Sequence, residues 1–329
     1  MSQRKNRLDL KSYYDGILNG DRLILSKAIT LIESSLPEDQ ELADLLIQKI
    51  LPHSGKSLRL GITGVPGAGK SAFIESFGSM LVNTGMKIAV LPIDPSSRYS
   101  KGSILGDKTR MEKLSSHANA FIRPSASGGM LGGVTSRTQE AILLCEAAGF
   151  NLIFIETVGV GQSEVKISDL TDLVLLLLVA GTGDELQTLK KGIMEVADIF
   201  IVSKTDGENM ERALEYAKAI KQSLSYLSKD SVQVFNCSSE TQYGLAEIWD
   251  YIKKAESASR YDGSLNQRRR QQNYFWLVGI IDQMLHNEFY KNEEVQNNFL
   301  TMKDSVMKGE ISAQEAAKQL FNIFKGKGH

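Results

Sequence analysis

The sequence predicts an α/β domain with a mostly parallel central sheet, carrying helical extensions at both of its ends. Seven short apolar runs alternate with segments of helical periodicity between residues 56 and 260. Continuous apolar runs fit strands that are buried on both faces, and helices on both faces of a parallel sheet provide that burial. No proline follows Pro124, which suits long C-terminal helices. We therefore expect an N-terminal helical extension over 1–55, the α/β domain over 56–260 and a C-terminal helical arm over 261–329.

Composition excludes several classes of protein. The 329 residues carry a net charge of −1, so no overall field attracts the chain to nucleic acid or an anionic membrane. Two cysteines are too few for a disulfide framework, which favours a cytoplasmic setting. The N-terminus lacks the apolar segment of a signal peptide. The longest apolar run, 173–180, is much shorter than the ~20 residues that span a bilayer and is expected to be a buried strand.

The N-terminal extension should contain two amphipathic helices. In DRLILSKAITLIESS, Asp21 is a suitable N-cap. The next helix should begin at Pro37, which is followed by acidic residues in its first turn. The apolar face expected for the first helix consists of Leu23, Ile24, Ala28, Ile29, Leu31 and Ile32.

The α/β domain should alternate strands and helices as far as a closing helix over 244–257. From about residue 264 the pattern is helical only, and the basic run RRRQQ, 268–272, is expected to form a solvated helix face or a dimer contact. The seven expected strands are 58–63, 87–94, 120–124, 152–157, 173–180, 199–204 and 232–237, with clear helices between them at 71–85 and 135–149.

The segment GVPGAGKS, 64–71, matches the phosphate-loop pattern G-x-x-x-x-G-K-[ST]. Backbone N–H groups must approach a polyphosphate closely, which explains why side chains are small here. Lys70 should reach the β- and γ-phosphates, and the Ser71 hydroxyl should bind Mg²⁺. The expected nucleotide contacts in this segment are Gly64, Val65, Pro66, Gly67, Ala68, Gly69, Lys70, Ser71 and Ala72.

Acidic residues follow two other expected strands and are candidates for the metal site. Asp94 ends one strand and Glu156 ends another, and ligands bind at the carboxyl edge of such sheets. Asp107 lies in the loop after Asp94 and is a third acid able to reach the site. We expect Mg²⁺ to be held among Ser71 and these three carboxylates.

The segment ETVGVGQ offers two further contacts. The Gly159 N–H is placed to meet a γ-phosphate, and Gln162 is a candidate for positioning the attacking water. A plain surface amide is the alternative for Gln162. The residues expected to take part in hydrolysis are therefore Lys70, Asp94, Asp107 and Gln162.

The segment SKTD, 203–206, is similar to the guanine-binding pattern N-K-x-D. Asp206 would accept two N–H donors from guanine, a pair that adenine lacks. The Lys204 stem would cover the base. Ser203 replaces the usual Asn and so removes an amide that normally braces the phosphate loop and the base, and we therefore expect weaker guanine affinity than usual. After the last strand, the backbone of Ser238 or Ser239 is expected to meet the guanine oxygen.

Taken together, GVPGAGKS, DPSSRYSKGSILGDKTRM, ETVGVGQSE and GTGDELQTLKKGIMEVADIFIVSKTDG resemble the MeaB/ArgK family in order and spacing, from about residue 20 to residue 275. This resemblance implies a P-loop GTPase fold with a low hydrolysis rate and a homodimer formed by C-terminal helices. It also implies a chaperone that gates adenosylcobalamin delivery to methylmalonyl-CoA mutase or a related acyl-CoA mutase and protects it. A loop over 181–191, with Asp184, Gln187 and Lys190, would signal the nucleotide state to the mutase.

The resemblance places adenosylcobalamin on the mutase. The sequence has no D-x-H-x-x-G pattern, and its four histidines, His53, His117, His286 and His329, are scattered. Three other functions remain open at this stage. One is a nucleotide-dependent kinase linked to amino-acid transport, and another is a nickel-insertion GTPase, although that class usually carries His-rich or Cys/His sites. The third is a non-enzymatic scaffold that only binds nucleotide, because Ser203 is unusual.

Overall fold

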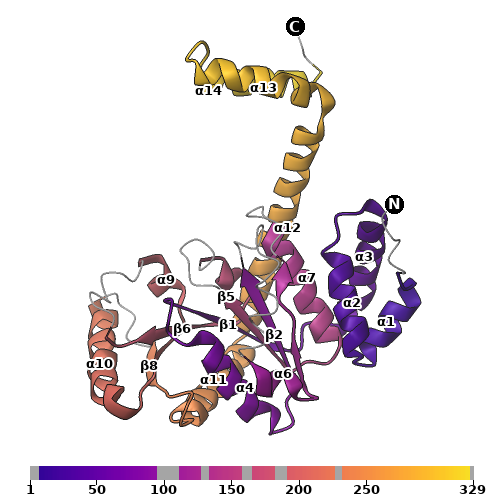
Figure 1. Ribbon diagram of the computed structural model, residues 1–329. Coiled ribbons are helices and arrows are strands. Elements are labelled where there is room, and N and C mark those ends of the chain that lie inside the picture. The colour runs from indigo at the N-terminus through magenta and orange to yellow at the C-terminus, as the bar shows by residue number, and fades with distance from the viewer. Residues whose placement is uncertain are drawn as a thin grey trace. The chain divides into compact units, whose positions relative to one another are not determined.

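The computed structural model describes residues 7–94, 111–126, 133–157, 165–181, 191–226 and 232–326 (Figure 1). The chain divides into two compact units, 1–273 and 274–329. The first unit contains both the N-terminal helices and the α/β domain, and the second is entirely helical in its described part. The boundaries expected from the sequence, at 55/56 and 260/261, stay predictions about functional regions.

Helices α1 (Leu10–Leu18), α2 (Arg22–Ile32) and α3 (Pro37–Ile50) form the N-terminal extension and pack beside α7 (Gly133–Ala147), as Figure 1 shows. The Asp21 cap is confirmed, because its carboxylate accepts hydrogen bonds from the N–H groups of Leu23 and Ile24 at 2.8 and 3.1 Å. The expected apolar face was wrong at one position. Leu23 is 76% exposed, and Leu25 is buried in its place.

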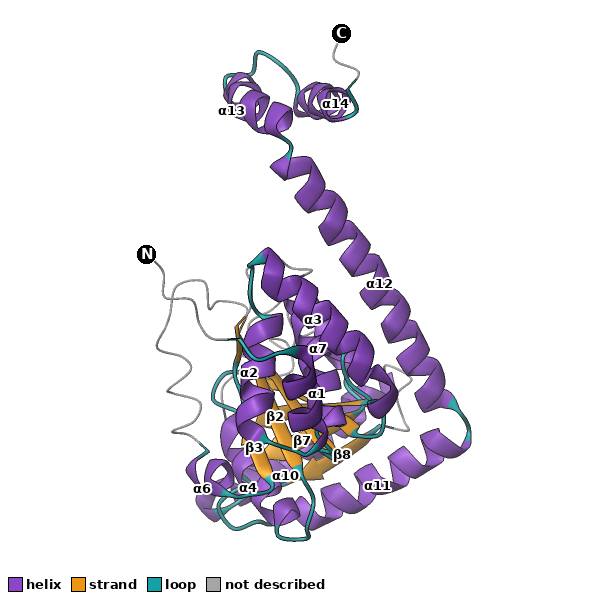
Figure 2. Cartoon of the chain, turned by 90° about the vertical axis from the view of Figure 1, so that its right-hand side faces the viewer, coloured by secondary structure: helices purple, strands orange, loops and turns teal. Residues whose placement is uncertain are grey.

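The predicted parallel sheet is confirmed. Its strand order is β3-β2-β5-β1-β6-β7-β8, and every pair in it is parallel. The sheet lies at the centre of the first unit with helices around it (Figure 2). The strands are β1 (Leu58–Gly64), β2 (Ile88–Asp94), β3 (Ala120–Ile122), β5 (Leu152–Thr157), β6 (Leu173–Val179), β7 (Ile199–Ser203) and β8 (Gln233–Asn236).

One strand was not predicted. The two residues of β4 (Ser125–Ala126) pair in parallel with the end of β2, at Ile93 and Asp94. Two residues are too few to show a periodic pattern, so nothing in the sequence distinguishes them from a loop.

Helices cover both faces of the sheet, as the apolar strands require. One face packs against α4 (Lys70–Val82), α6 (Glu112–Ser116) and α11 (Leu245–Tyr261). The other face packs, at β6 and β7, against α9 (Lys191–Val196) and α10 (Met210–Tyr226). Successive residues of one strand pack into the hydrophobic cores on opposite faces of the sheet, as Leu177 and Leu178 do. Both faces of β6 are therefore buried, which explains the unbroken apolar run at 173–180.

Buried charges hold the start of α12 (Ser264–Lys291) to the amino edge of the sheet. Arg269 forms an ion pair with Asp172 at 2.6 Å and also donates to the carbonyl oxygens of Gly55 and Ser57, each at 2.6 Å. Asp172 accepts a further hydrogen bond from the N–H of Arg59 at 2.8 Å. The expectation of a solvated or dimer-forming face for 268–272 was therefore wrong for Arg269, and it was wrong for Gln272 as well, which is 5% exposed.

The same edge holds a second ion pair inside the protein. Arg59 donates to both oxygens of Glu146 at 2.9 and 3.0 Å, and Ser57 adds a hydroxyl bond of 2.6 Å. Gln272 of α12 donates its amide to the carbonyl oxygens of Ser168 and Thr171, both at 2.8 Å. These bonds fix β1, whose other end carries the phosphate loop.

Arg269→Ala is expected to lower the free energy of unfolding by about 2–3 kcal/mol, because it leaves the Asp172 carboxylate buried without its guanidinium partner. The neighbouring Arg270 is exposed, so Arg270→Ala is the matched control and should cost less than about 0.5 kcal/mol. Urea unfolding followed by circular dichroism measures both. Equal stability of the two variants would show that the Arg269 pair does not hold the helix.

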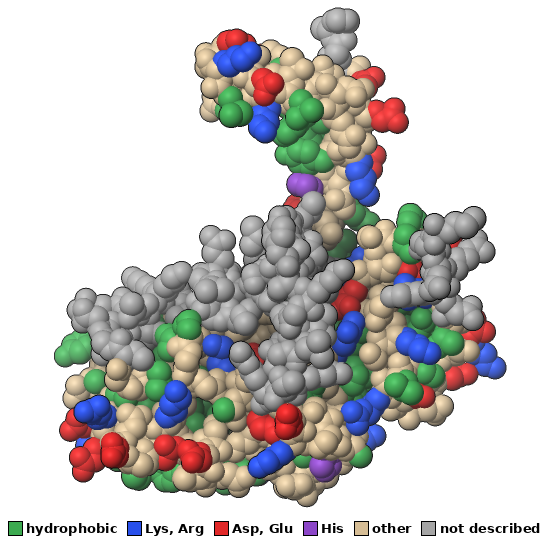
Figure 3. Space-filling view, in the orientation of Figure 1, with side chains coloured by type: hydrophobic (Ala, Val, Ile, Leu, Met, Phe, Trp, Pro, Cys, Tyr) green, Lys and Arg blue, Asp and Glu red, His purple; other side chains and the backbone are tan. Residues whose placement is uncertain are grey.

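The second unit consists of the rest of α12 with α13 (Glu293–Met307) and α14 (Ala313–Phe324). Phe289 packs against Phe321 and Phe324, with ring centroids 6.2 and 5.3 Å apart, and Val295 is fully buried. Many apolar side chains of this unit nevertheless remain on its surface, where Figure 3 shows hydrophobic groups. They include Tyr274, Phe275, Leu277, Ile281, Met284, Leu285 and Leu300.

Acidic and basic side chains are interspersed over the face of the first unit that Figure 3 draws, in keeping with the small net charge. Within the described ranges, none of the helices has the combination of length and apolar character that crossing a bilayer requires.

Candidate nucleotide site

The phosphate loop connects β1, the central strand, to α4. Gly64 has φ 150°, and a Cβ there would lie 2.1 Å from the carbonyl oxygen of Leu177 on β6, so no side chain fits. Gly67 and Gly69 have φ of 81° and 78°, in the left-handed region that glycine adopts without strain. Gly69 is also the N-cap of α4. The backbone therefore turns through glycines and ends on a helix N-terminus, which suits an anion.

Lys70 lies over this loop. Its ammonium donates to the carbonyl oxygens of Gly64 and Val65 at 2.9 and 3.3 Å. The side chain thus folds back across the turn that it follows. An ammonium held there is placed to meet phosphate oxygens that enter the loop.

Ser71 and Glu156 meet at the carboxyl edge of the sheet. The Ser71 hydroxyl donates to Glu156 Oε1 at 2.9 Å, and Glu156 is only 7% exposed. The contact arises because β5 pairs with β1, with Glu156 opposite Ile62. A hydroxyl and a carboxylate brought together by neighbouring strands are hard oxygen donors of the kind that Mg²⁺ binds. The residues present therefore fit the metal.

Several predicted residues fall outside what the structure describes. Asp94 ends β2, two strands from β1, but its side chain is not among the described groups. Asp107, Gly159 and Gln162 lie outside the described residues, as does 182–190, which holds Asp184, Gln187 and Lys190. Their expected roles stay predictions.

Ser203 braces the phosphate loop after all. Its hydroxyl lies 2.7 Å from the carbonyl oxygen of Ala68 and 2.9 Å from that of Leu178, and the residue is 2% exposed. The Ser203 hydroxyl therefore supplies a contact to this loop in place of the Asn amide, while the expected weaker guanine affinity stays a prediction. Because β7 ends close beside the loop, a short hydroxyl spans the gap to Ala68.

Ser203→Ala is expected to weaken GDP binding about five- to tenfold, because the Ala68 carbonyl loses its buried donor and the loop is held less firmly. Ser203→Thr keeps the hydroxyl and should retain most of the affinity. Titration calorimetry with Mg·GDP compares the two variants, and equal affinities of Ala and wild type would contradict the bracing role.

The segment 203–206 at the end of β7, called here the base loop, places Lys204 and Asp206 at one wall of a cavity. Lys204 has φ 57°, and its carbonyl oxygen accepts the Asn209 amide at 2.8 Å, which stabilises this unusual conformation. A Cβ at Gly69 would lie 4.0 Å from Lys204 Cε, so the lysine stem runs beside the phosphate loop. The Lys204 stem and the Asp206 carboxylate therefore flank the same space.

Ser238 supports Asp206 instead of facing a ligand. Its hydroxyl donates to Asp206 Oδ2 and accepts from the N–H groups of Glu240 and Thr241 at 3.2 and 3.1 Å. Its own N–H is bonded to the carbonyl oxygen of Tyr243 at 3.1 Å. Ser239 lines the cavity. This geometry favours Ser239 over Ser238 for the predicted contact with the guanine oxygen.

Cys237 lies behind this loop and is not a nucleophile. Burial, followed by the Asp206 charge, raises the pKa of the Cys237 thiol to about 12. At neutral pH the sulfur is protonated, and thiols in that form are poorly reactive.

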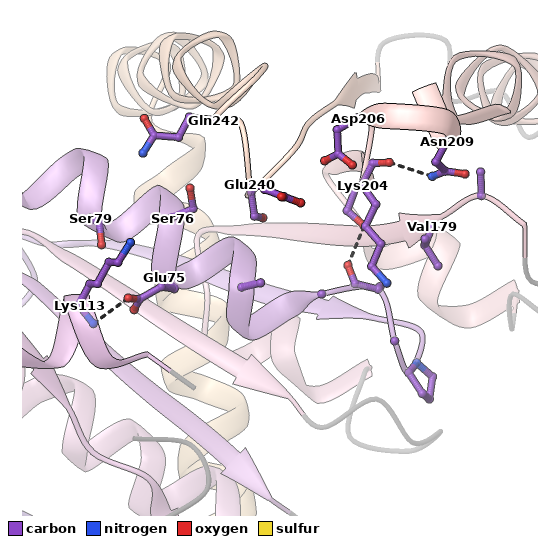
Figure 4. A pocket seen from close by; sticks show the side chains of 18 residues that line it. Glu75, Ser76, Ser79, Lys113, Val179, Lys204, Asp206, Asn209, Glu240 and Gln242 are labelled. Carbon is purple, nitrogen blue, oxygen red and sulfur yellow. Dashed lines mark hydrogen bonds between the residues drawn. The ribbon is translucent and has the colours of Figure 1, made fainter. Parts of the chain in front are cut away.

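A cavity of about 880 Å³ joins the two loops. Pro66, Gly67, Ala68 and Gly69 line it at the phosphate loop, and Ser203, Lys204 and Asp206 line it at the base loop. Figure 4 shows Lys204, Asp206 and Asn209 on one side of the space and Glu75, Ser76, Ser79 and Lys113 on the other. The second group was missed in the sequence, because helical polar residues and a lysine after a loop carry no motif.

This fold and this site together define the class of P-loop GTPases: a phosphate loop on the central strand of a parallel sheet and an aspartate-bearing loop two strands away. The particular family follows from comparison of the whole chain. The chain belongs to the family described as Methylmalonyl Co-A mutase-associated GTPase MeaB, whose family model matches residues 25–294.

Named relatives agree with this assignment. The GTPase ArgK of Escherichia coli is 41% identical over 92% of this chain and 92% of its own. A mitochondrial protein of Mus musculus named methylmalonic aciduria type A homolog is 40% identical over 95% of this chain and 79% of its own. The crystal structure of an LAO/AO transport system kinase is similar with a TM-score of 0.76 and 34% identity, covering 98% of this chain and 99% of that one.

Proposed function

We propose that this GTPase is a chaperone of an adenosylcobalamin-dependent acyl-CoA mutase, and that it gates delivery of the cofactor and protects the mutase. Membership of a family described by its association with methylmalonyl-CoA mutase carries the proposal. The name of the mouse relative points to the same metabolism. On this proposal adenosylcobalamin stays with the mutase, and the chaperone contributes the nucleotide cycle.

Mg²⁺ and GTP would be held by the residues of the cavity edge. Lys70 and the loop N–H groups would take the β- and γ-phosphates, while Ser71 and Glu156 would hold or orient the metal shell. Asp206 would read the guanine edge. The metal supplies charge neutralisation on the phosphates when bound. Asp94, Asp107 and Gln162 are proposed to complete the shell and to position water.

The second unit is proposed to form a homodimer. Several apolar side chains of its helix α12 are exposed, including Phe275, Leu277, Ile281 and Leu285. Exposed apolar surface of this kind is typical of a protein–protein interface. A second copy of the same helix would cover such a surface. A concentration series in analytical ultracentrifugation tests this proposal.

The direct test of the function measures GTP hydrolysis with and without a purified methylmalonyl-CoA mutase of the same organism. We expect a slow intrinsic rate that rises in the presence of the mutase, together with nucleotide-dependent transfer of adenosylcobalamin to the apo-mutase. A normal intrinsic rate with neither stimulation nor transfer would contradict the chaperone role.

A kinase linked to transport is the second candidate, because the similar crystal structure carries that description. Incubation with γ-labelled GTP or ATP and a cell extract separates the two. Label that appears on a protein supports the kinase, and label that appears only as inorganic phosphate supports the GTPase chaperone.

A further inference from the structure

Four polar residues on one side of the nucleotide cavity belong to none of the sequence motifs of this protein. They are Glu75, Ser76 and Ser79 of α4 and Lys113 of α6, and they are called here the α4–α6 wall. All four residues line the nucleotide cavity. Figure 4 places them together, across the cavity from Lys204 and Asp206. The contacts proposed for the phosphate loop and the base loop give this wall no role.

The wall starts where the phosphate loop stops. Glu75, Ser76 and Ser79 stand three, four and seven residues after Ala72, so the four share one face of α4. Ala72 lies in the first turn of that helix, next to the loop that would hold the phosphates. A nucleotide with its phosphates there and its base at Asp206 has only its sugar left to meet this face.

The wall is held rigidly. Glu75 accepts hydrogen bonds from the N–H groups of Lys113 at 2.8 Å and of Leu114 at 3.2 and 3.3 Å. Leu114 is fully buried, and a Cβ at Gly78 would lie 2.7 Å from its Cδ2, so α4 and α6 are in close contact. A site built on two locked helices can discriminate between similar ligands.

One hydroxyl of the wall has an unused hydrogen-bonding capacity. Ser79 Oγ is buried and has no hydrogen-bond partner within the described part of the chain. A buried hydroxyl of that kind normally has a partner, and here it belongs to a residue that lines a cavity. This observation points to a ligand group that can donate or accept a hydrogen bond.

The chemistry of the wall selects among nucleotide groups. A carboxylate, an ammonium and serine hydroxyls are complementary to hydroxyls, which both donate and accept. Resting on the proposed GTP site, we infer that the α4–α6 wall recognises the ribose 2′- and 3′-hydroxyls and makes the protein selective for ribonucleotides.

Titration calorimetry of the full-length protein tests this inference with Mg·GDP, Mg·2′-deoxy-GDP and Mg·3′-deoxy-GDP. Wild type should bind GDP about tenfold more tightly than at least one deoxy analogue. Lys113→Met and Ser79→Ala should reduce that ratio to about twofold by weakening GDP binding alone. Lys218→Met, an exposed position on α10, is the matched control and should keep the wild-type ratio.

Glu75→Gln is a less clean variant, because Glu75 also holds the start of α6. Equal binding of GDP and both deoxy analogues by wild type would overturn the inference. A wild-type preference that survives in both Lys113→Met and Ser79→Ala would overturn it as well. Failure of the folded wild type to bind GDP at all would instead contradict the proposed nucleotide site.

Discussion

Lys70→Ala is expected to weaken GTP binding about a thousandfold, or about 4 kcal/mol, and to leave the fold unchanged. The Lys70 ammonium lies over the phosphate loop, bonded to the carbonyl oxygens of Gly64 and Val65, where it would neutralise the β- and γ-phosphates. The truncation should change the free energy of unfolding little, because the lost Lys70 contacts lie on the surface of the loop and the hydrophobic core behind the loop is unchanged.

Binding of a fluorescent GTP analogue and circular dichroism, measured on the same preparation, check both halves of this expectation. Lys113→Met is a useful comparison, since it removes another lysine of the same cavity and should affect triphosphate binding far less. A Lys70→Ala protein that is folded and binds GTP within tenfold of wild type would contradict the assignment of the phosphate loop.

Asp206→Asn is expected to lower the preference for GTP over ATP about 100- to 1000-fold. Guanine offers two N–H donors to a carboxylate, and an amide would turn a donor of its own toward one of them. The Ser238 hydroxyl, which donates to Asp206, should hold the asparagine in the same position. The loss is therefore expected to come from the base contact and not from movement of the loop.

Xanthosine triphosphate provides the matching gain. Xanthine carries a carbonyl oxygen where guanine carries an amino group, so the asparagine amide can donate to it. Competition binding of GTP, ATP and XTP to wild type and variant measures both changes at once. Full retention of GTP preference by Asp206→Asn, with no improvement for XTP, would show that another residue reads the base.

The sequence predicted the part of the site in which binding depends on the conformation of the backbone. Residues 64–71 must let N–H groups approach a phosphate, so most of their side chains are small. This composition can be recognised in the sequence without knowledge of the fold. Glu156 was chosen because it ends an apolar run, and the ends of parallel strands share one edge, where it meets Ser71. Asp94 was chosen by the same argument, and its role stays a prediction. The parallel sheet itself followed from runs such as 173–180, which only burial on both faces explains.

The sequence failed where a contact joins distant segments through a single side chain. The sequence shows only that Ser203 lacks the usual Asn amide, whereas the packing of β7 against the loop lets its hydroxyl reach the Ala68 carbonyl oxygen. Leu23 is a different kind of error, because Leu25 stands three, four and seven residues before Ala28, Ile29 and Ile32, and helical spacing itself favours Leu25 for the buried face. Arg269 was expected to be solvated as part of a basic run, but it forms an ion pair with Asp172.

Local patterns therefore determined the type and order of the elements and the phosphate loop of this protein, because helical periodicity, strand burial and glycine requirements act over a few neighbouring residues. Tertiary structure alone decided the partners of Ser203 and Arg269 and brought Glu75 and Lys113 to the wall facing Asp206. Those contacts depend on how elements far apart in the sequence pack together, as the Glu75 bond to the Lys113 N–H, 38 residues away, illustrates. Such packing is decided by the whole core and leaves no mark on any short stretch of sequence.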